Sequence, residues 1–124
     1  MLINLSNHPS SIWSEKQLLA AFPFGEILDI PFPCIPPDWE TEQVEHCALD
    51  YFEKIRAIAQ KSDESPIIHI AGEPVFCFIL IQLLLKNRFS CITSTTERIV
   101  TVKEGTKVSE FKFNQFRRFK IIEL

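Results

Sequence analysis

The sequence predicts an α/β fold: a three-layer α/β/α sandwich, Rossmann-like, with a mainly parallel sheet and a C-terminal β-hairpin. Strand-type and helix-type patterns alternate as far as Thr93, which favours parallel strands joined by right-handed crossovers. Beyond that point two strand-like runs flank residues 104–107, a turn that contains Gly105. The 124 residues suffice for one core and are too few for two. We therefore expect a single domain over residues 1–124.

The first elements are short. Residues 2–5 form an apolar run that predicts a strand, and a polar loop follows it. Ser14 with Gln17 three residues later matches a capping box, which predicts a helix that ends near Phe22. Residues 26–30 alternate between polar and apolar side chains and predict the second strand.

A proline-rich run over residues 31–37 separates these elements from the next helix, because proline removes backbone donors and constrains its neighbours. Apolar residues at helical spacing predict an amphipathic helix over residues 38–61. Residues 66–70 predict the third strand, and Pro74 suits the first position of the helix that follows a glycine turn. Residues 90–93 predict the fourth strand.

The helix that begins at Pro74 is unusually apolar. From Val75 to Leu85 its only polar residue is Gln82, whereas a helix on one face of a small sheet normally buries a single stripe. A second copy of the protein would cover the outer face, so we expect a homodimer through this helix. Burial by the C-terminal hairpin or tail is the alternative.

Charge is unevenly distributed along the chain. Residues 1–85 carry 4 Lys/Arg against 12 Asp/Glu, a net charge of −8, and residues 86–124 carry 9 against 4, a net charge of +5. A surface dipole would explain this pattern without any ligand. If the protein binds an anion, we expect it to lie near the C-terminal third.

The four cysteines have neither zinc-site spacing nor the density of a secreted disulfide scaffold, so we expect free thiols and no bound metal. The first residues lack the basic region of a secretion signal. The longest apolar run, residues 75–85, is shorter than the roughly 20 residues that cross a bilayer. These observations predict a cytoplasmic protein without a membrane partner.

Three predicted loops, residues 7–13, 72–74 and 94–98, would share the carboxyl edge of a parallel sheet, where ligands bind in open α/β folds. Backbone amides at the helix starts could bind phosphate oxygens, and Arg98 would add a forked cation. No Walker loop or G-x-G-x-x-G is present, so we expect no nucleotide cofactor. The hydroxyls available for phosphate binding are those of Ser10, Ser11, Ser94, Thr95 and Thr96.

His8 is the natural acid/base candidate, since imidazole exchanges protons near neutral pH. A loop histidine that merely caps a backbone carbonyl is the competing interpretation. His69 lies in an apolar strand and is expected to be a satisfied core group, and His46 is expected to be solvated. The chain has no nucleophile elbow for Ser-His-Asp hydrolysis.

The other polar candidates each have two interpretations. Glu73 could orient a ribose, pair with Arg98 or act as a transferase nucleophile, or it could simply carry a favourable charge at a helix start. Trp13 could stack on a base or pack on the following helix. Arg117 and its basic neighbours could reach phosphates, or they could form a solvated edge that alternates with core phenylalanines.

Four segments together resemble small CRISPR-associated proteins of the single-domain CARF-like, ring nuclease type. These segments are the N-terminal stretch Leu2 to Ser11, the strand that leads to Gly72-Glu73, the run Ser94-Thr95-Thr96-Glu97-Arg98 and the ending Phe116-Arg117-Arg118-Phe119. The resemblance implies a domain that binds a cyclic oligoadenylate second messenger in a dimer cleft. It also implies cleavage of that ring, which would switch off type III CRISPR signalling.

Such cleavage needs a ribose 2′-hydroxyl to attack the adjacent phosphorus in line, which a protein can promote by positioning and charge stabilisation without a metal. The resemblance implies a catalytic set of His8, Ser11 and Arg98. A non-catalytic nucleotide sensor or a protein-interaction adaptor remains the alternative, and duplex nucleic acid is not expected as a partner. The ligand-binding residues would be Asn7, Ser10, Trp13, Gly72, Glu73, Ser94, Thr95, Thr96 and Arg117.

Overall fold

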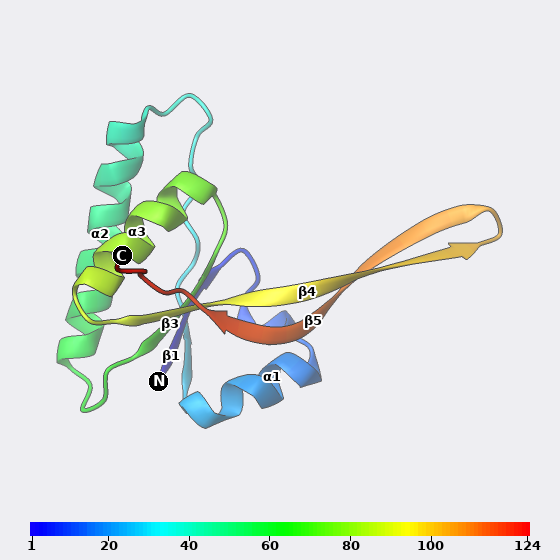
Figure 1. Cartoon of the computed structure of the whole chain (residues 1–124), viewed down its shortest axis with the longest axis horizontal. Helices are drawn as coiled ribbons and strands as arrows, with labels where there is room; N and C mark the ends of the chain where they lie inside the picture. The colour runs from blue at the N-terminus through cyan, green and yellow to red at the C-terminus, as the bar shows by residue number, and fades with distance from the viewer.

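The computed structural model describes residues 1–124, which fold around one five-stranded sheet with the strand order β2-β1-β3-β4-β5 (Figure 1). Strands β1 to β4 run parallel, and β5 is antiparallel to β4. The predicted α/β fold with a mainly parallel sheet and a C-terminal hairpin is confirmed. The strands are β1 (Leu2–Ser6), β2 (Ile27–Asp29), β3 (Ile67–Ala71), β4 (Ser90–Lys103) and β5 (Thr106–Arg118).

Helices cover both faces of the sheet, as the prediction of three layers requires. Helices α2 (Thr41–Gln60) and α3 (Pro74–Lys86) lie on one face, and α1 (Glu15–Ala21) lies on the other (Figure 1). Two 3₁₀ turns flank α1, namely η1 (Ser10–Ile12) and η2 (Phe22–Phe24). Pro74 occupies the start of α3, as expected from its missing N–H.

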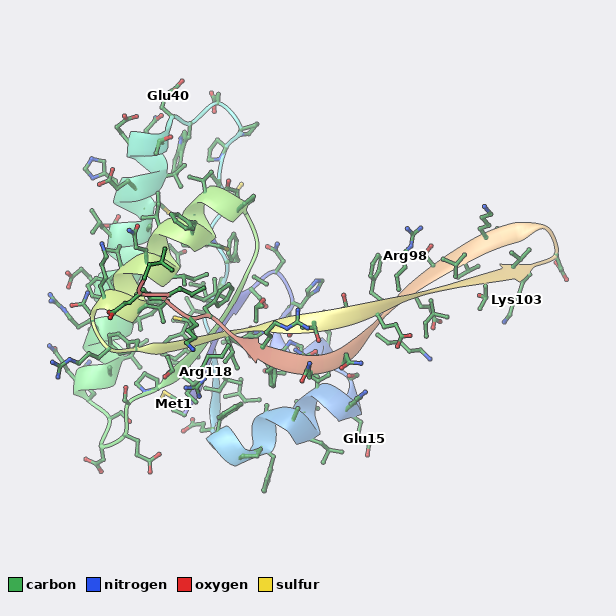
Figure 2. The ribbon with its side chains drawn as sticks, in the orientation of Figure 1. Met1, Glu15, Glu40, Arg98, Lys103 and Arg118 are labelled. Carbon is green, nitrogen blue, oxygen red and sulfur yellow. The ribbon has the colours of Figure 1, made fainter.

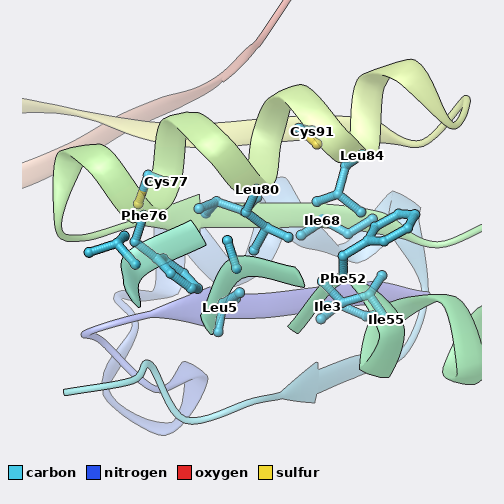
Figure 3. Close-up of a cluster of buried hydrophobic side chains, with 13 residues drawn as sticks. Ile3, Leu5, Phe52, Ile55, Ile68, Phe76, Cys77, Leu80, Leu84 and Cys91 are labelled. Carbon is cyan, nitrogen blue, oxygen red and sulfur yellow. The ribbon is translucent and has the colours of Figure 1, made fainter. Parts of the chain in front are cut away.

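The larger core lies between the sheet and the pair α2/α3 (Figure 3). Ile3 and Leu5 of β1 and Ile68 of β3 point into it, because successive strand residues alternate between faces. Phe76 of α3 is fully buried, and its ring meets the rings of Phe32 and Tyr51 edge-on, at centroid distances of 5.2 and 5.5 Å. A smaller cluster under α1 is formed by Leu2, Trp13, Ala21 and Ile92.

Most of the apolar surface of α3 is covered within one chain. Phe76, Cys77, Leu80 and Leu84 are buried against the sheet and α2, and four further apolar side chains of α3 are half-buried beside them. Phe119 of the C-terminal tail packs against the same cluster. The outer positions Val75 and Phe78 stay exposed, at 43% and 69%.

Strand β4 does not end at Thr93. It continues to Lys103 and pairs with β5 from Ile92 to Lys103, with one register shift between Thr95 and Thr96. The prediction that residues 94–98 form a loop is therefore wrong. Threonine and isoleucine have high strand propensity, and β5 supplies the hydrogen-bond partners that no parallel neighbour offers there. The distal part of this hairpin projects well beyond the rest of the molecule (Figure 1).

No disulfide is formed, and all four cysteines are free. Burial raises the pKa of the Cys77 and Cys91 thiols to about 12, so both behave as small apolar groups rather than as nucleophiles. None of the helices combines the length and the hydrophobicity that crossing a bilayer would require.

Candidate functional site

The α1-facing side of the sheet changes from apolar to polar toward the carboxyl ends of three adjacent strands. Leu2 and Ile92 belong to the small core under α1, whereas the residues two positions further along the same strands, Asn4 and Ser94, are polar. On β3 the same step leads from Ile67 to His69. Because side chains two apart on a strand share a face, the three polar side chains gather at one place.

Strand register then aligns these side chains into a row. Asp29, Asn4 and His69 lie at matching positions of β2, β1 and β3. The Asn4 amide nitrogen donates to Asp29 Oδ1 at 2.7 Å, and Asn4 Oδ1 lies 2.8 Å from His69 Nδ1. His69 Nε2 lies 2.7 Å from Ser94 Oγ on β4. Four strands thus contribute to one continuous hydrogen-bonded chain, Asp29–Asn4–His69–Ser94.

The hydrogen-bond partners fix the direction of every bond in this chain. The Asn4 amide nitrogen donates to Asp29 and to the backbone carbonyl of His8, so Asn4 Oδ1 is the atom that faces His69. An amide oxygen only accepts, hence His69 Nδ1 carries the proton and Nε2 presents a lone pair. The hydroxyl of Ser94 therefore donates to His69 Nε2.

Ser94 has a further polar partner from the helix above it. Gln17 Nε2 donates to Ser94 Oγ at 3.1 Å. The expected capping box at Ser14 is only half formed: Ser14 accepts from the Gln17 backbone N–H, while the Gln17 side chain turns to Ser94 instead of back to the helix start. Gln17 thus links α1 to the polar row.

His69 is kept neutral by its surroundings. It is 2% exposed, and the rings of Trp13 and Phe116 meet the imidazole edge-on at centroid distances of 5.3 and 5.5 Å. Burial, and to a smaller extent electrostatic repulsion from the nearby His8, together lower the pKa of His69 to about 4. At neutral pH the imidazole is therefore uncharged, with an available lone pair on Nε2.

This buried histidine predicts a loss of stability in mild acid. The unfolded chain binds the His69 proton near pH 6.5 and the folded chain only near pH 4, so stability is full above 6.5 and falls as the pH drops toward 4. The expected loss across this window is about 3 kcal/mol. Urea unfolding at several pH values measures it. His69→Gln should remove this dependence and the exposed His46→Gln should keep it, whereas equal pH dependence of the His69→Gln and wild-type proteins would contradict the assignment.

Asp29 anchors the other end of the row. Partial burial acts to raise its pKa, but hydrogen bonds from Ser10 and Asn4 outweigh this, and the pKa lies below its ordinary value. Ser10 Oγ donates to Asp29 Oδ2 at 2.6 Å, and the Ser10 backbone N–H donates to Oδ1 at 2.9 Å. Asp29 is thus an ionised carboxylate that orients Asn4 and holds the start of η1.

A cavity of about 790 Å³ opens over the Ser94 end of the row, at the carboxyl edge of β1, β3 and β4. This is the edge at which the sequence predicts a ligand crevice. Cationic and aromatic side chains join the polar row in its walls. The lining residues include Ser6, His8, Trp13, Lys16, Gln17, His69, Ser94, Thr96, Glu97, Phe111, Lys112 and Phe113.

Four of the predicted site residues line this cavity: His8, Trp13, Ser94 and Thr96. The His8 side chain is exposed, while its backbone carbonyl accepts from Asn4, Ser6 and the Trp13 indole N–H. Trp13 is 8% exposed and belongs to the core under α1, which matches the packing interpretation. Its edge nevertheless contributes to the cavity wall.

Other predicted residues lie apart from this cavity. Asn7 lines a smaller cavity of about 410 Å³ on the β2 side. Glu73 caps α3 by accepting from the backbone N–H groups of Val75 and Phe76, which matches the helix-start interpretation. Gly72 has a positive φ of 157°, and a Cβ at this position would overlap the Phe32 ring. The glycine is therefore needed for the close packing of Phe32 against the backbone. Ser11 is exposed in η1.

The structure also separates the predicted hydroxyl and arginine positions. Thr95 Oγ1 donates to the Gln115 carbonyl and accepts from its N–H, at the register shift of the hairpin. Arg98 lies on the projecting part of the hairpin, where it donates to Ser109 Oγ at 3.1 Å (Figure 2). Arg117 lies opposite Thr93 and is exposed. None of the three is among the cavity-lining residues.

The sequence-based prediction missed several side chains of the site. His69 was assigned to the core, and the roles of Asn4 and Asp29 were not recognised. The pattern that could have revealed them is the apolar-to-polar step repeated on three predicted strands. Also missed were the cavity-lining residues Lys16, Gln17, Phe111 and Lys112. No cluster of three or more His, Cys, Asp or Glu side chains suited to a metal ion is present.

The fold and the cavity together define an α/β protein with a candidate ligand site at the carboxyl edge of its parallel strands. Residues 1–117 match the family described as Uncharacterized protein MJ1673 family, and the chain belongs to that family. No curated protein matches the chain, and no solved structure does either.

Proposed function

We propose that this protein binds a cyclic oligoadenylate in the 790 Å³ cavity and cleaves it by in-line attack of a ribose 2′-hydroxyl without a metal. In this proposal it acts in the cytoplasm and switches off type III CRISPR signalling. The single observation that carries the proposal is the composition of the cavity lining. It combines hydroxyls with the ammonium groups of Lys16 and Lys112, which together suit a ribose-phosphate backbone.

The cavity also offers an aromatic surface for a base. Phe111 lines it and remains 69% exposed, whereas Trp13 and Phe113 are buried at 8% each. Stacking of a base on an aromatic side chain contributes about 1–3 kcal/mol and tolerates any base. Phe111 is therefore the residue that we assign to adenine stacking, in place of the predicted Trp13.

The proposed reaction requires positioning more than strong acids or bases. The 2′-oxygen attacks phosphorus opposite the departing 5′-oxygen, and the lysines stabilise the charge that develops on the phosphate oxygens. Proton transfer by His8 remains a prediction, supported by its exposed imidazole at the cavity wall. Ser11 and Arg98 lie outside the cavity, so we do not assign them to the reaction within one chain.

A second copy of the chain is part of the proposal. A cavity of 790 Å³ lies within the range that holds a drug-sized ligand, which corresponds to part of a cyclic tetra-adenylate ring rather than all of it. We propose a homodimer through the helix around Val75 to Leu85, where Val75 and Phe78 are exposed. This helix covers the sheet face opposite α1, whereas residues of α1 line the cavity, so each cavity of such a dimer would bind its own ring.

The test is incubation of the protein with cyclic tetra-adenylate in EDTA, followed by chromatography of the products. Linear fragments with 2′,3′-cyclic phosphate ends are the expected result, because the 2′-oxygen becomes bonded to phosphorus. An intact ring that is retained by the protein would instead indicate the non-catalytic sensor. If the ring is neither retained nor cleaved, both the ring nuclease and the sensor are refuted, and the protein-interaction adaptor is left as the alternative.

A further inference from the structure

The hydroxyl of Ser94 has an unusual set of partners for a serine at a cavity wall. It donates to His69 Nε2 at 2.7 Å and accepts from Gln17 Nε2 at 3.1 Å. A hydroxyl oxygen has two lone pairs, and only one of them is occupied by these bonds. Ser94 lines the cavity, so a bound molecule can use the second lone pair. Only a hydrogen-bond donor, such as a substrate hydroxyl, can occupy that position.

We propose that Ser94, His69 and Asn4 form a proton relay that accepts the proton of a substrate hydroxyl bound against Ser94 Oγ. His69 is the proton acceptor, and Asn4 is a positioning residue that holds the Nδ1–H tautomer of the imidazole. Asp29 fixes Asn4 in turn through the bond to its amide nitrogen. The substrate of the relay would be a ribonucleotide phosphodiester, and this part of the inference rests on the proposed function.

The arrangement fulfils the geometric requirements for activating a hydroxyl. The hydroxyl and its base are within hydrogen-bond distance, and a third group orients the base. The orienting group here is an amide instead of the carboxylate of the Ser-His-Asp triad, and the carboxylate of Asp29 lies one residue further along the chain of bonds. A hydrogen-bond network that only stabilised the sheet would not need to end at a cavity, with a lone pair of Ser94 Oγ free to accept from a ligand.

The step balances without any co-reactant. The 2′-O–H proton moves to Ser94 Oγ while the Ser94 proton moves to His69 Nε2. The 2′-oxygen then bonds to phosphorus, and the bond from phosphorus to the 5′-oxygen breaks. The 5′-oxygen takes a proton from solvent, and His69 returns its proton to solvent through Ser94. The products are a 2′,3′-cyclic phosphate and a 5′-hydroxyl, and no oxidant, reductant or added water is consumed.

Reaction with a fluorophosphonate tests the relay without using the ring. Ser94 Oγ would bond to phosphorus as the P–F bond breaks, with the serine proton passing to His69 and fluoride leaving. Peptide mass spectrometry of the labelled wild-type protein should place the modification on Ser94 and not on the exposed Ser11. His69→Gln should slow labelling by roughly 10²-fold or more. Ser94→Ala should abolish it.

If a variant fails to fold, the position of the label in the wild-type protein still tests the relay. Absence of label on Ser94, or equal labelling of Ser94 and Ser11, would overturn the relay. His69-dependent labelling of Ser94 in a protein that does not cleave cyclic tetra-adenylate would support the relay and refute the proposed function. Ring cleavage that is equally fast in wild type and Ser94→Ala would refute the relay and leave the proposed function standing.

Discussion

Replacing Ser94 by alanine should lower the single-turnover rate of cyclic tetra-adenylate cleavage by roughly 10²- to 10⁴-fold, the usual contribution of general acid–base catalysis. The variant leaves His69 in place but removes the oxygen through which a substrate hydroxyl would reach Nε2. Lysine and aromatic contacts would remain, so ring affinity should change much less than the rate. Quenched-flow chromatography gives the rate, and equilibrium binding gives the affinity.

Ser90→Ala is the matched control, because Ser90 is the first residue of the same strand, four positions before Ser94, and does not line the cavity. Its cleavage rate should equal that of the wild type. A Ser94→Ala protein that cleaves at the wild-type rate would exclude Ser94 from the mechanism. A parallel loss of rate and affinity would instead make Ser94 a binding residue only.

Replacing Phe76 by alanine should destabilise the fold by about 3–5 kcal/mol, the typical cost of truncating a buried aromatic side chain. Phe76 is fully buried where α3, α2 and the proline-rich connector meet, and its ring contacts both Phe32 and Tyr51. The surrounding side chains are held by the sheet and by two helices, so they would relax only partly into the cavity that the truncation leaves. Urea unfolding followed by far-UV circular dichroism measures the loss.

Phe22→Ala is the comparison variant, since Phe22 is 82% exposed. Its free energy of unfolding should lie within about 0.5 kcal/mol of the wild-type value, as for most surface substitutions. Equal destabilisation by the two substitutions would contradict the placement of Phe76 at the centre of the core.

The fold could be predicted from the sequence because its elements are set by local patterns. The period of apolar residues defines α2, and the glycine turn before Pro74 marks the junction between β3 and α3. The length of β4 was underestimated for a non-local reason. Residues Ser94 to Arg98 are polar enough for a loop, and only their pairing with β5 makes them a strand.

The candidate site could be predicted only in part. The carboxyl edge follows from parallel topology, and His8, Trp13, Ser94 and Thr96 do line the cavity there. Arg98 was misplaced because it belongs to β4 and not to a loop, and its side chain donates to Ser109 on β5 and does not line the cavity. In a strand, successive side chains point to opposite faces and each residue advances the chain by about 3.3 Å. Which side chains reach the cavity can therefore be predicted only when the first and last residues of the strand are known.

The polar row was missed because it depends on register between strands. His69 is a polar residue among isoleucines, which in sequence is typical of a satisfied core group. That interpretation is correct in so far as both ring nitrogens have partners. What sequence could not show is that Asn4 stands beside His69 on β1, and that the Ser94 end of the same bonds opens into a cavity.

The measurement that tests the proposed function most directly compares two rings in EDTA: cyclic tetra-adenylate and the same ring made of 2′-deoxyadenosine. The protein should bind both, linearise the ribose ring to products with 2′,3′-cyclic phosphate ends and leave the deoxy ring intact. Cleavage of both rings would contradict attack by the 2′-hydroxyl, and failure to bind or cleave either ring would contradict the assignment of the cavity to cyclic oligoadenylates.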